Sequence, residues 1–431
     1  MEKPREIAFQ VLVNARQSTG YLENQIDHAL RGHPCERRDA ALCRELVLGV
    51  TRRKLTLEHW VLALTKGRKQ PNKIQNLLAL GLYQLFFLER IPAHAAVSES
   101  VELAKTFIGK REAGFVNAVL RSAIRQRAAL ERDLAPDRPP CWSVAYSHPQ
   151  WLIDRWLSFW SHSEVKTLLE WNNRPPCHYA RRNPLKPEAT TLSQIWNQEQ
   201  LEHTLHNVDW WPEGELFQIH SVAQLAELDS FKRGLFYVQD PSTLLAVRAV
   251  DANPGQTVLD LCAAPGGKTT AIAATMANQG RIDALDNSPA RLELLTSNLK
   301  RLGVTIASPQ LNTSPSEVAD QASHERILVD APCSNTGVMR RRVELRWRLK
   351  LAEIHRLQKT QEQLLERAAK KLKPGGNLVY STCSLDPDEN QKVIKRFLSE
   401  SPNYECTFER TLTPWNENVD GAYVATLRRS N

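Results

Sequence analysis

The chain of 431 residues lacks long hydrophobic runs and low-complexity tracts. Its longest apolar stretch, LLALGLYQLFFL, falls short of the roughly 20 apolar residues that a membrane-spanning helix needs. The charged beginning, MEKPREIAFQ, does not have the pattern of a secretory signal peptide. Hydrophobic residues make up 42% of the chain, which fits globular folding. These features predict a soluble, cytoplasmic protein with no membrane partner.

Cysteines occur without the spacing of a metal site or a disulfide framework. The chain contains eight of them, but no CxxC pair. Because CxxC pairs supply the ligands of most structural zinc sites, no metal is predicted. Scattered cysteines in so long a chain indicate free thiols rather than disulfides.

Basic residues outnumber acidic residues in the N-terminal third and are balanced by them over the rest of the chain. Residues 1–140 contain 23 Lys and Arg but only 15 Asp and Glu, whereas the rest of the chain contains 33 of each. The whole net charge of +8 therefore lies in this third. A localised positive surface suits a polyanion such as RNA, although a solvated helical surface with a mild bias is an equal alternative.

Strand signals are scarce in the N-terminal part, which shows helical periodicity instead. Ala8, Val11, Leu12 and Ala15 recur at the spacing of one helix face. Similar faces occur in ALCRELVLGVTRRKLTLEHWVLAL and IQNLLALGLYQLFFLERI. These patterns predict an α-helical bundle over residues 1–135.

A proline-rich stretch at 134–142, LAPDRPPCW, lacks periodicity and is a candidate linker. The next part, 141–235, is predicted to be mixed α/β. HPQWLIDRWLSFW has the pattern of an amphipathic helix, and NNRPPCHYARRNPL that of a turn followed by a strand. The tryptophans of this part either stack on RNA bases beside Arg181 and Arg182 or belong to a core.

From residue 236 to 431, short apolar runs alternate with helical patterns. TVLDLC, RIDALD, RILVDAPC and NLVYSTC are the expected strands, and residues 352–372 form the clearest helix. This alternation predicts a parallel, doubly wound sheet with helices on both faces, which is a Rossmann-like α/β domain.

The segment VLDLCAAPGGKTT predicts a strand, a tight turn and a helix, but it lacks two common phosphate-binding motifs. Cys262 stands where a P-loop needs its first glycine, and no GxGxxG is present, which disfavours a dinucleotide-dependent oxidoreductase. Gly266 and Gly267 allow a ligand to approach the backbone closely at a helix N-terminus. Asp286, at the tip of the second strand, either binds a ribose diol or caps the helix that follows. An adenosine ligand without a diphosphate fits both features, and S-adenosylmethionine is the obvious candidate.

Two predicted strands end in cysteine, at ILVDAPCS with Cys333 and at LVYSTCSLD with Cys383. Because ligands bind outside the carboxyl ends of parallel strands, both cysteines and Asp330 are expected to converge on one crevice beside the glycine turn. A lone buried cysteine is usually a small hydrophobic residue. A thiolate can also attack C6 of a pyrimidine, so that C5 takes a methyl group from a sulfonium. The base must leave its stack to be reached.

The residues after the second cysteine predict a helix start. Asp386 is expected at the N-cap, with Pro387 at the first helical position and Glu389 at the third. An acid at the N-cap, a proline at the first helical position and a glutamate at the third are typical of a helix start with a capping box.

At these residues the sequence resembles the RNA cytosine-5 methyltransferases of the Sun/Fmu type. DLCAAPGGKTT, DAPCSNTGV and STCS carry the resemblance, in this order. GLYQLFFLERIPAHAAVSESVELAK and GFVNAVLR resemble the NusB-like helical domain of the ribosomal RNA small subunit methyltransferase B branch. HPQWL, NNRPP, VQDPS and DGAYVATL extend the resemblance over nearly the whole chain.

The resemblance implies methyl transfer from S-adenosylmethionine to C5 of a specific cytosine in 16S ribosomal RNA, through a covalent adduct at C6. It implies that Cys383 is the nucleophile, that Cys333 assists product release, and that Asp330 holds both the cytosine and the cofactor. The other implied cofactor-binding residues are Cys262, Ala263, Ala264, Pro265, Gly266, Gly267, Lys268 and Asp286. The NusB-like bundle is implied to help bind RNA. Methylation of another RNA such as tRNA, and a non-enzymatic RNA-binding or ribosome assembly factor, are the alternatives.

Two segments depart from the family pattern. Where the family has an acid after the third strand, near the cofactor's adenine, this chain has QLNTSPS, with Asn312 nearest. Where the family has RRHPD, residues 340–347 read RRRVELRW. The added positive charge of this second segment favours contact with phosphate.

Overall fold

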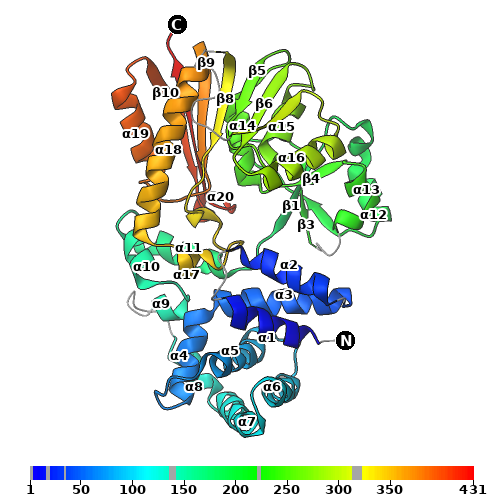
Figure 1. Cartoon of the computed structure of the whole chain (residues 1–431), viewed down its shortest axis with the longest axis vertical. Helices are drawn as coiled ribbons and strands as arrows, with labels where there is room; N and C mark the ends of the chain where they lie inside the picture. Colours follow the sequence, from blue (N-terminus) through cyan, green and yellow to red (C-terminus); the bar gives the residue numbers. More distant parts are fainter. Residues whose placement is uncertain (1–2, 16–19, 34, 135–141, 221–224, 313–322) are drawn as a thin grey trace. The chain divides into compact units, whose positions relative to one another are not determined.

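The structure, a computed structural model, describes residues 3–15, 20–33, 35–134, 142–220, 225–312 and 323–431. The chain divides into two compact units (Figure 1). The helical unit comprises Met1–Pro175 and Met339–Arg348, and the sheet unit comprises Pro176–Val338 and Leu349–Asn431. Part 141–235 contributes to both units, and the division of the chain into three functional parts stays a prediction. The candidate linker falls mainly on residues 135–141, which lie outside the described residues.

Among its described residues, the helical unit contains helices and no strand, so the α-helical prediction is confirmed. The central helix α5 is buried on all sides over nine consecutive residues. Gly49 of α3 allows close packing there, because a Cβ atom at this position would lie 2.0 Å from the ring of Tyr83. The helices are α1 (Pro4–Asn14), α2 (Leu22–Gly32), α3 (Arg37–Arg52), α4 (Lys54–Leu64), α5 (Asn72–Phe87), α6 (Ala93–Phe107), α7 (Lys110–Arg125), α8 (Arg127–Arg132), α9 (Trp142–Ala145), α10 (Gln150–Leu157), α11 (His162–Asn173) and α17 (Leu345–Arg348).

The tryptophans of residues 141–235, the part predicted to be mixed α/β, mostly belong to a core. Trp142, Trp156 and Trp171 are buried in the helical unit. Arg181 is also buried, in the sheet unit, where it donates hydrogen bonds to Gln239 and Thr270. Of the two alternatives, the core is therefore favoured over a base-stacking surface at Arg181.

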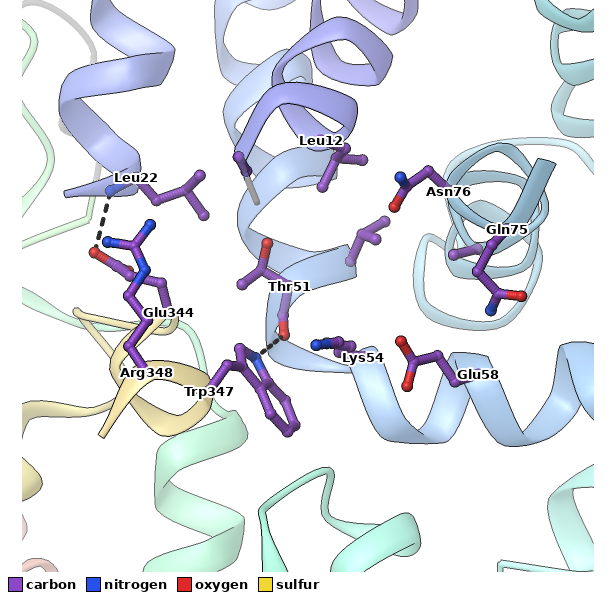
Figure 2. A pocket seen from close by; sticks show the side chains of 13 residues that line it. Leu12, Leu22, Thr51, Lys54, Glu58, Gln75, Asn76, Glu344, Trp347 and Arg348 are labelled. Carbon is purple, nitrogen blue, oxygen red and sulfur yellow. Dashed lines mark hydrogen bonds between the residues drawn. The ribbon is translucent and has the colours of Figure 1, made fainter. Parts of the chain in front are cut away.

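The segment Met339–Arg348 belongs to the helical unit although it is separated from the rest of that unit in sequence. Figure 2 shows two of its anchoring hydrogen bonds: the amide of Leu22 donates to Glu344, and the indole of Trp347 donates to the carbonyl of Thr51. Glu344, Trp347 and Arg348 line a pocket of about 410 Å³ together with residues of the helices around it.

The arginines of this segment differ in their surroundings. Arg346 is fully buried and donates to the carbonyl oxygens of Arg52, Ser147 and Asn172 and to the side chain of Asn173. Arg340 is also buried, with its guanidinium 3.9 Å from the ring centre of Trp171. The expectation that the segment's positive charge contacts phosphate is wrong for these two arginines, because both are shielded from any anion in solution.

The sheet unit contains two sheets. The smaller one is antiparallel, in the order β2-β3-β1-β4. The larger one has the order β10-β11-β9-β8-β5-β6-β7. Strands β9, β8, β5, β6 and β7 are parallel, and β11 is antiparallel to both of its neighbours, β9 and the edge strand β10. The strands are β1 (His178–Arg182), β2 (His203–Leu205), β3 (Leu216–Ile219), β4 (Phe236–Val238), β5 (Thr257–Asp260), β6 (Arg281–Asp286), β7 (Ala307–Leu311), β8 (His324–Asp330), β9 (Leu372–Thr382), β10 (Tyr404–Leu412) and β11 (Ala422–Arg429).

Helices cover both faces of the larger sheet, which confirms the doubly wound prediction (Figure 1). Successive strand residues point to opposite faces. Val258 and Leu328 pack against α14, α15 and α16, whereas Leu259 and Ile327 pack against α18 and α19. The unit's helices are α12 (Leu192–Gln198), α13 (Asp229–Lys232), α14 (Leu244–Val250), α15 (Gly267–Thr275), α16 (Pro289–Leu302), α18 (Leu351–Lys371), α19 (Gln391–Glu400) and α20 (Pro414–Glu417). Over the described ranges, no helix has both the length and the apolar content of a membrane span.

The buried arginine of the Met339–Arg348 segment gives a stability prediction. Arg346→Ala should lower the free energy of unfolding of the helical unit by about 3 kcal/mol, because it leaves four buried acceptors without their donor. Arg342→Ala is the matched control, since Arg342 forms a partly exposed ion pair with Glu23 and should cost under about 1 kcal/mol. Calorimetric unfolding of the full chain measures both, and equal losses would contradict the structural role of Arg346.

Candidate active site

The glycine turn connects β5 to α15. Gly266 has φ +104°, and a Cβ atom there would lie 2.7 Å from Leu295 of α16. The amide of Ala263 donates to the carbonyl of Leu285 in the neighbouring strand β6 over 2.8 Å. Helix α15 starts at Gly267, directly after the turn. The turn is therefore fixed between two strands and a helix, and its glycine is required by both backbone geometry and space.

Asp260 lies buried beneath this turn, at the end of β5. Its Oδ2 accepts a hydrogen bond of 2.7 Å from Thr269, whereas its Oδ1 has no hydrogen-bond partner among the described residues. Burial raises the pKa of Asp260 to about 7; the hydrogen bond from Thr269 opposes this rise, and the negative charge of Asp330 adds to it. A buried polar atom without a partner is costly, and a ligand with a donor group would satisfy it.

Asp286 lies at the end of β6 and is buried by contacts on three sides. Its carboxylate accepts from the amides of Ala264 and Ser288 at 3.2 and 3.0 Å and pairs with Arg291 at 2.8 Å. The N-cap of α16 is Ser288, so the alternative in which Asp286 caps that helix is wrong. Asp286 instead joins the glycine turn to the start of α16.

Asn312 directly follows the third strand, β7. Its amide donates to the carbonyl of Asp286 over 2.9 Å, and its side-chain oxygen accepts from Arg367 over 3.1 Å. The residue therefore lies beside the acid of the second strand, with an amide where the resemblance would have a carboxylate.

Lys268 links the glycine turn to the end of β8. Its ammonium lies 2.7 Å from Oδ2 of Asp330, whose Oδ1 accepts a hydrogen bond of 2.9 Å from Ser381 of β9. Burial alone would lower the pKa of Lys268, but its ion pair with Asp330 outweighs burial and raises it. Lys268 is therefore a fixed cation beside the cysteine loops. Sequence spacing did not indicate this ion pair.

Cys333 and Cys383 lie side by side, as their strand positions predicted. Their Sγ atoms are 3.3 Å apart, within a thiol hydrogen bond in which either can donate. The thiol of Cys383 also donates to Oδ1 of Asn335 over 3.0 Å, and Nδ2 of Asn335 donates to the carbonyl of Cys333 over 2.7 Å. The sequence reasoning missed Asn335. Its position before Thr-Gly in a loop was a signal for the positive φ of 57° that it adopts.

The pKa values of two thiols at this sheet edge, those of Cys333 and Cys262, are raised. The pKa of Cys333 is raised well above its ordinary value by its hydrogen bond with Cys383, by burial and by the charges of Cys383 and Glu389. Burial raises the pKa of Cys262 as well, and the carboxylates around it add to the rise. Cys262 is therefore suited to packing beside a ligand and not to nucleophilic attack.

The predicted helix cap after Cys383 is wrong. Helix α19 starts at Gln391, with Asn390 as its N-cap. Asp386 instead accepts the amide of Asp388 within a turn, and Glu389 is fully buried. Although the sequence has the pattern of a helix cap, Glu389 points into the interior, because its hydrogen bonds to residues of other elements outweigh the local capping bonds.

The structure thus brings the predicted site residues together in two groups. The first is the turn 262–268 with Asp286, and the second is Asp330 with the two cysteines. Lys268 joins the two groups through Asp330. A Rossmann-like sheet with such an edge, in a chain with an N-terminal helical part, is typical of a two-part methyltransferase.

Comparison with known proteins agrees with this class. A family model described as 16S rRNA methyltransferase RsmB/F matches residues 247–428, and a model of the NusB family matches residues 2–125. The chain belongs to the RsmB/F family of methyltransferases and carries a NusB-type helical domain.

Curated relatives match over almost their whole length. A probable ribosomal RNA small subunit methyltransferase B of Synechocystis is 34% identical, with 100% of both chains covered. The ribosomal RNA small subunit methyltransferase B of Klebsiella pneumoniae is also 34% identical, with 91% of each covered.

Solved structures share the fold. A methyltransferase homolog protein from Pyrococcus horikoshii is 28% identical and has a TM-score of 0.59, with 69% of this chain and 100% of that one covered. The protein PH0851 has a TM-score of 0.80 at 22% identity, over 100% of this chain and 99% of that one.

Asp260 gives a prediction for the pH dependence of stability. Its folded pKa of about 7 exceeds the ordinary value of 3.8, so the folded chain keeps a proton that the unfolded chain has lost between these pH values. Its contribution to stability is therefore full at low pH and is lost as the pH rises through 7.

Asp260→Asn should flatten this decline by an amount on the order of a few kcal/mol between pH 5 and 8. Urea unfolding across this range, followed in the sheet unit, measures the effect. An unchanged pH profile in the variant would mean that Asp260 is charged throughout the range.

Proposed function

We propose that this protein transfers a methyl group from S-adenosylmethionine to C5 of a cytosine in 16S ribosomal RNA, through a covalent adduct between Cys383 and C6. One observation carries the proposal: the Cys333 and Cys383 sulfur atoms lie 3.3 Å apart at the edge where Asp330 and Lys268 form an ion pair. A lone structural cysteine needs neither a second thiol nor a partly buried ion pair beside it. The printed names of the relatives, ribosomal RNA small subunit methyltransferase B, support the same substrate.

The residues of the turn fit the proposed cofactor. The unpartnered Oδ1 of Asp260 offers an acceptor to a bound donor, and Gly266 leaves space at the backbone. Cys262 to Lys268, Asp286 and Asp330 would hold S-adenosylmethionine, and Asn312 beside Asp286 offers a further amide. When bound, this cofactor supplies an electrophilic methyl group on a sulfonium.

The first step is attack of the Cys383 thiolate on C6 of a cytosine that has left its stack. The ammonium of Lys268, paired with Asp330, places a positive charge at the same sheet edge. A bond forms between Sγ and C6, and the C5–C6 double-bond electrons move toward C5 and N3. A proton passes from the ammonium of Lys268 through Asp330, 2.7 Å away, to N3 and neutralises the charge that develops on the ring, and C5 becomes the nucleophile that accepts the methyl group.

The second step is release, in which the C5 proton leaves and the bond between Cys383 and C6 breaks. Cys333 is protonated in the free enzyme, partly because of the negative charge and the hydrogen bond of Cys383. Once Cys383 is a neutral thioether in the adduct, both of these causes are gone, whereas burial and the charge of Glu389 remain. Cys333 therefore acts as the base only after its own proton has passed to water. Its thiolate then accepts the C5 proton, the C5–C6 double bond re-forms, and Cys383 leaves as a thiolate.

RNA binding is proposed for both units. The N-terminal third has the whole positive excess of the chain, and the NusB family model matches it. The sheet unit adds a hollow lined by Lys186, Lys232, Arg233, Lys300 and Arg301, with Glu188 as its single acid. Clustered cations of this kind suit an RNA backbone. Methylation of tRNA and a purely binding role in ribosome assembly remain as alternatives to be tested.

Cys383→Ala should abolish methyl transfer to RNA, with a loss of at least about 1,000-fold, while calorimetric binding of S-adenosylmethionine persists. Cys406→Ala, which removes an exposed free thiol elsewhere in the sheet unit, is the matched control and should stay active. Bisulfite sequencing of 16S rRNA and tRNA identifies the modified base and the RNA class. A fully active Cys383→Ala variant would refute the assignment, and a wild type that binds RNA but never methylates it would favour the assembly factor.

Cys333→Ala should accumulate the covalent complex with RNA, because C5 deprotonation and release of Cys383 are slowed. The complex appears as a protein band of reduced mobility on a denaturing gel, and it should be absent from a Cys333→Ala/Cys383→Ala double variant. If the single variant turns over without such a band, another group performs release.

A further inference from the structure

Glu389 is a fully buried acid that the proposed chemistry does not use. Four donors surround its carboxylate. The amide of Ser334 and the side chain of Gln361 donate to Oε1 at 2.8 and 3.1 Å. The hydroxyl groups of Ser334 and Ser384 donate to Oε2, the second at 2.6 Å. A buried charge without a cationic partner is costly, and this number of donors is what offsets its desolvation.

The donors belong to the two cysteine loops. Ser334 directly follows Cys333 at the end of β8, and Ser384 directly follows Cys383 at the end of β9. Gln361 of α18, which donates to the same carboxylate, also donates to the carbonyl of Pro332 over 2.9 Å. The carboxylate of Glu389 thus binds the serine that follows each cysteine. Gln361, which donates to this carboxylate, also binds Pro332, the residue before Cys333.

We propose that Glu389 is a positioning residue for methyl transfer: it fixes the two cysteine loops against each other so that both thiols face one substrate atom pair. The inference rests on the function proposed above. Glu389 forms no hydrogen bond with either sulfur atom among the described contacts, so it acts through the two serines. This role explains why an acid with a cap-like sequence position is turned into the interior.

A carboxylate suits this position better than the amide of the same shape. Both oxygens accept, and Oε2 accepts from two hydroxyl groups at once. The amide nitrogen of a glutamine cannot accept there. The Ser384 oxygen is poorly placed to accept from an amide as well, because the amide of Asp386 and the hydroxyl group of Thr336, each 3.0 Å away, already lie against its two lone pairs. Glu389→Gln therefore keeps the volume of the side chain but weakens the hydrogen bonds that hold the two cysteine loops together.

The test compares Glu389→Gln with Glu325→Gln in the full chain. Glu325 is a matched control, because its carboxylate also accepts from a backbone amide and a hydroxyl group, both of Thr257, and joins β8 to β5 at their amino ends. Glu389→Gln should lower kcat for RNA methylation by about 10-fold to 100-fold with KM and cofactor affinity unchanged, since small displacements of reacting groups cost this much. Glu325→Gln should stay within about twofold of wild type.

Two further measurements separate positioning from general destabilisation. Ser384→Ala alone should lower kcat by about 10-fold. Adding it to Glu389→Gln should cause little further loss, because both variants remove the same hydrogen bond between Ser384 and Glu389. The rate at which iodoacetamide alkylates Cys383, followed by peptide mass spectrometry, should rise by about threefold or more in Glu389→Gln, because the loop is less restrained. This rate needs neither RNA nor methyl transfer.

The outcomes are distinguishable from failure of the proposed function. A wild type that does not methylate cytosine, or an active Cys383→Ala variant, refutes the function, whereas the alkylation rates still test the loop restraint. Wild-type kcat in Glu389→Gln, a change in KM alone, or losses that multiply in the double variant would overturn the positioning role. If Glu389→Gln does not bind cofactor, Ser334→Ala and Ser384→Ala, which retain the acid, test the same hydrogen bonds.

Discussion

The site depends on the parallel pairing of β8 with β9. This pairing places Asp330 opposite Ser381. Cys333 follows three residues after Asp330 and Cys383 two residues after Ser381, and their sulfur atoms lie 3.3 Å apart. Parallel neighbours need a long crossover, which α18 provides with 21 residues on one face of the sheet. A slip of one residue in this register would turn every side chain of the slipped strand to the other face and separate Asp330 from its partners.

The acids at this sheet edge are compensated in different ways. Asp330 has a cation in Lys268, Asp286 has Arg291 and two backbone amides, and Glu389 has four neutral donors. Asp260 has one hydroxyl donor and one unpartnered oxygen, and its pKa is near 7. Among these four acids, Asp260 is the one with a carboxylate oxygen that has no hydrogen bond from a described residue, and it lies beneath the glycine turn.

Predictions from the sequence were correct where a local pattern of apolar and polar residues follows directly from the burial of a strand or helix. The strands at Cys333 and Cys383 were predictable because apolar runs followed by polar loops report burial, and parallel strands share an edge. Such predictions failed where two contacts compete for one side chain. Asp386 and Glu389 have the spacing of a cap, yet Glu389 gains more from donors in other parts of the unit, above all from Ser334, which is 55 residues away. Arg346 appeared suited to phosphate because charge is visible in a sequence, whereas the carbonyl groups that surround it are not.

The sequence by itself determined the two architectures, the alternation of strands and helices, the glycine turn and the placement of both cysteines at strand ends, since each of these follows from local periodicity or a local backbone requirement. Only the tertiary structure decided which charges meet. The Lys268–Asp330 pair, the Asn335 contact with Cys383, and the burial of Arg346 and Glu389 all join residues far apart in the chain or reverse a local preference. The physical reason is that the desolvation of a charge depends on everything packed around it, and the sequence neighbours of a residue supply only a small part of that packing.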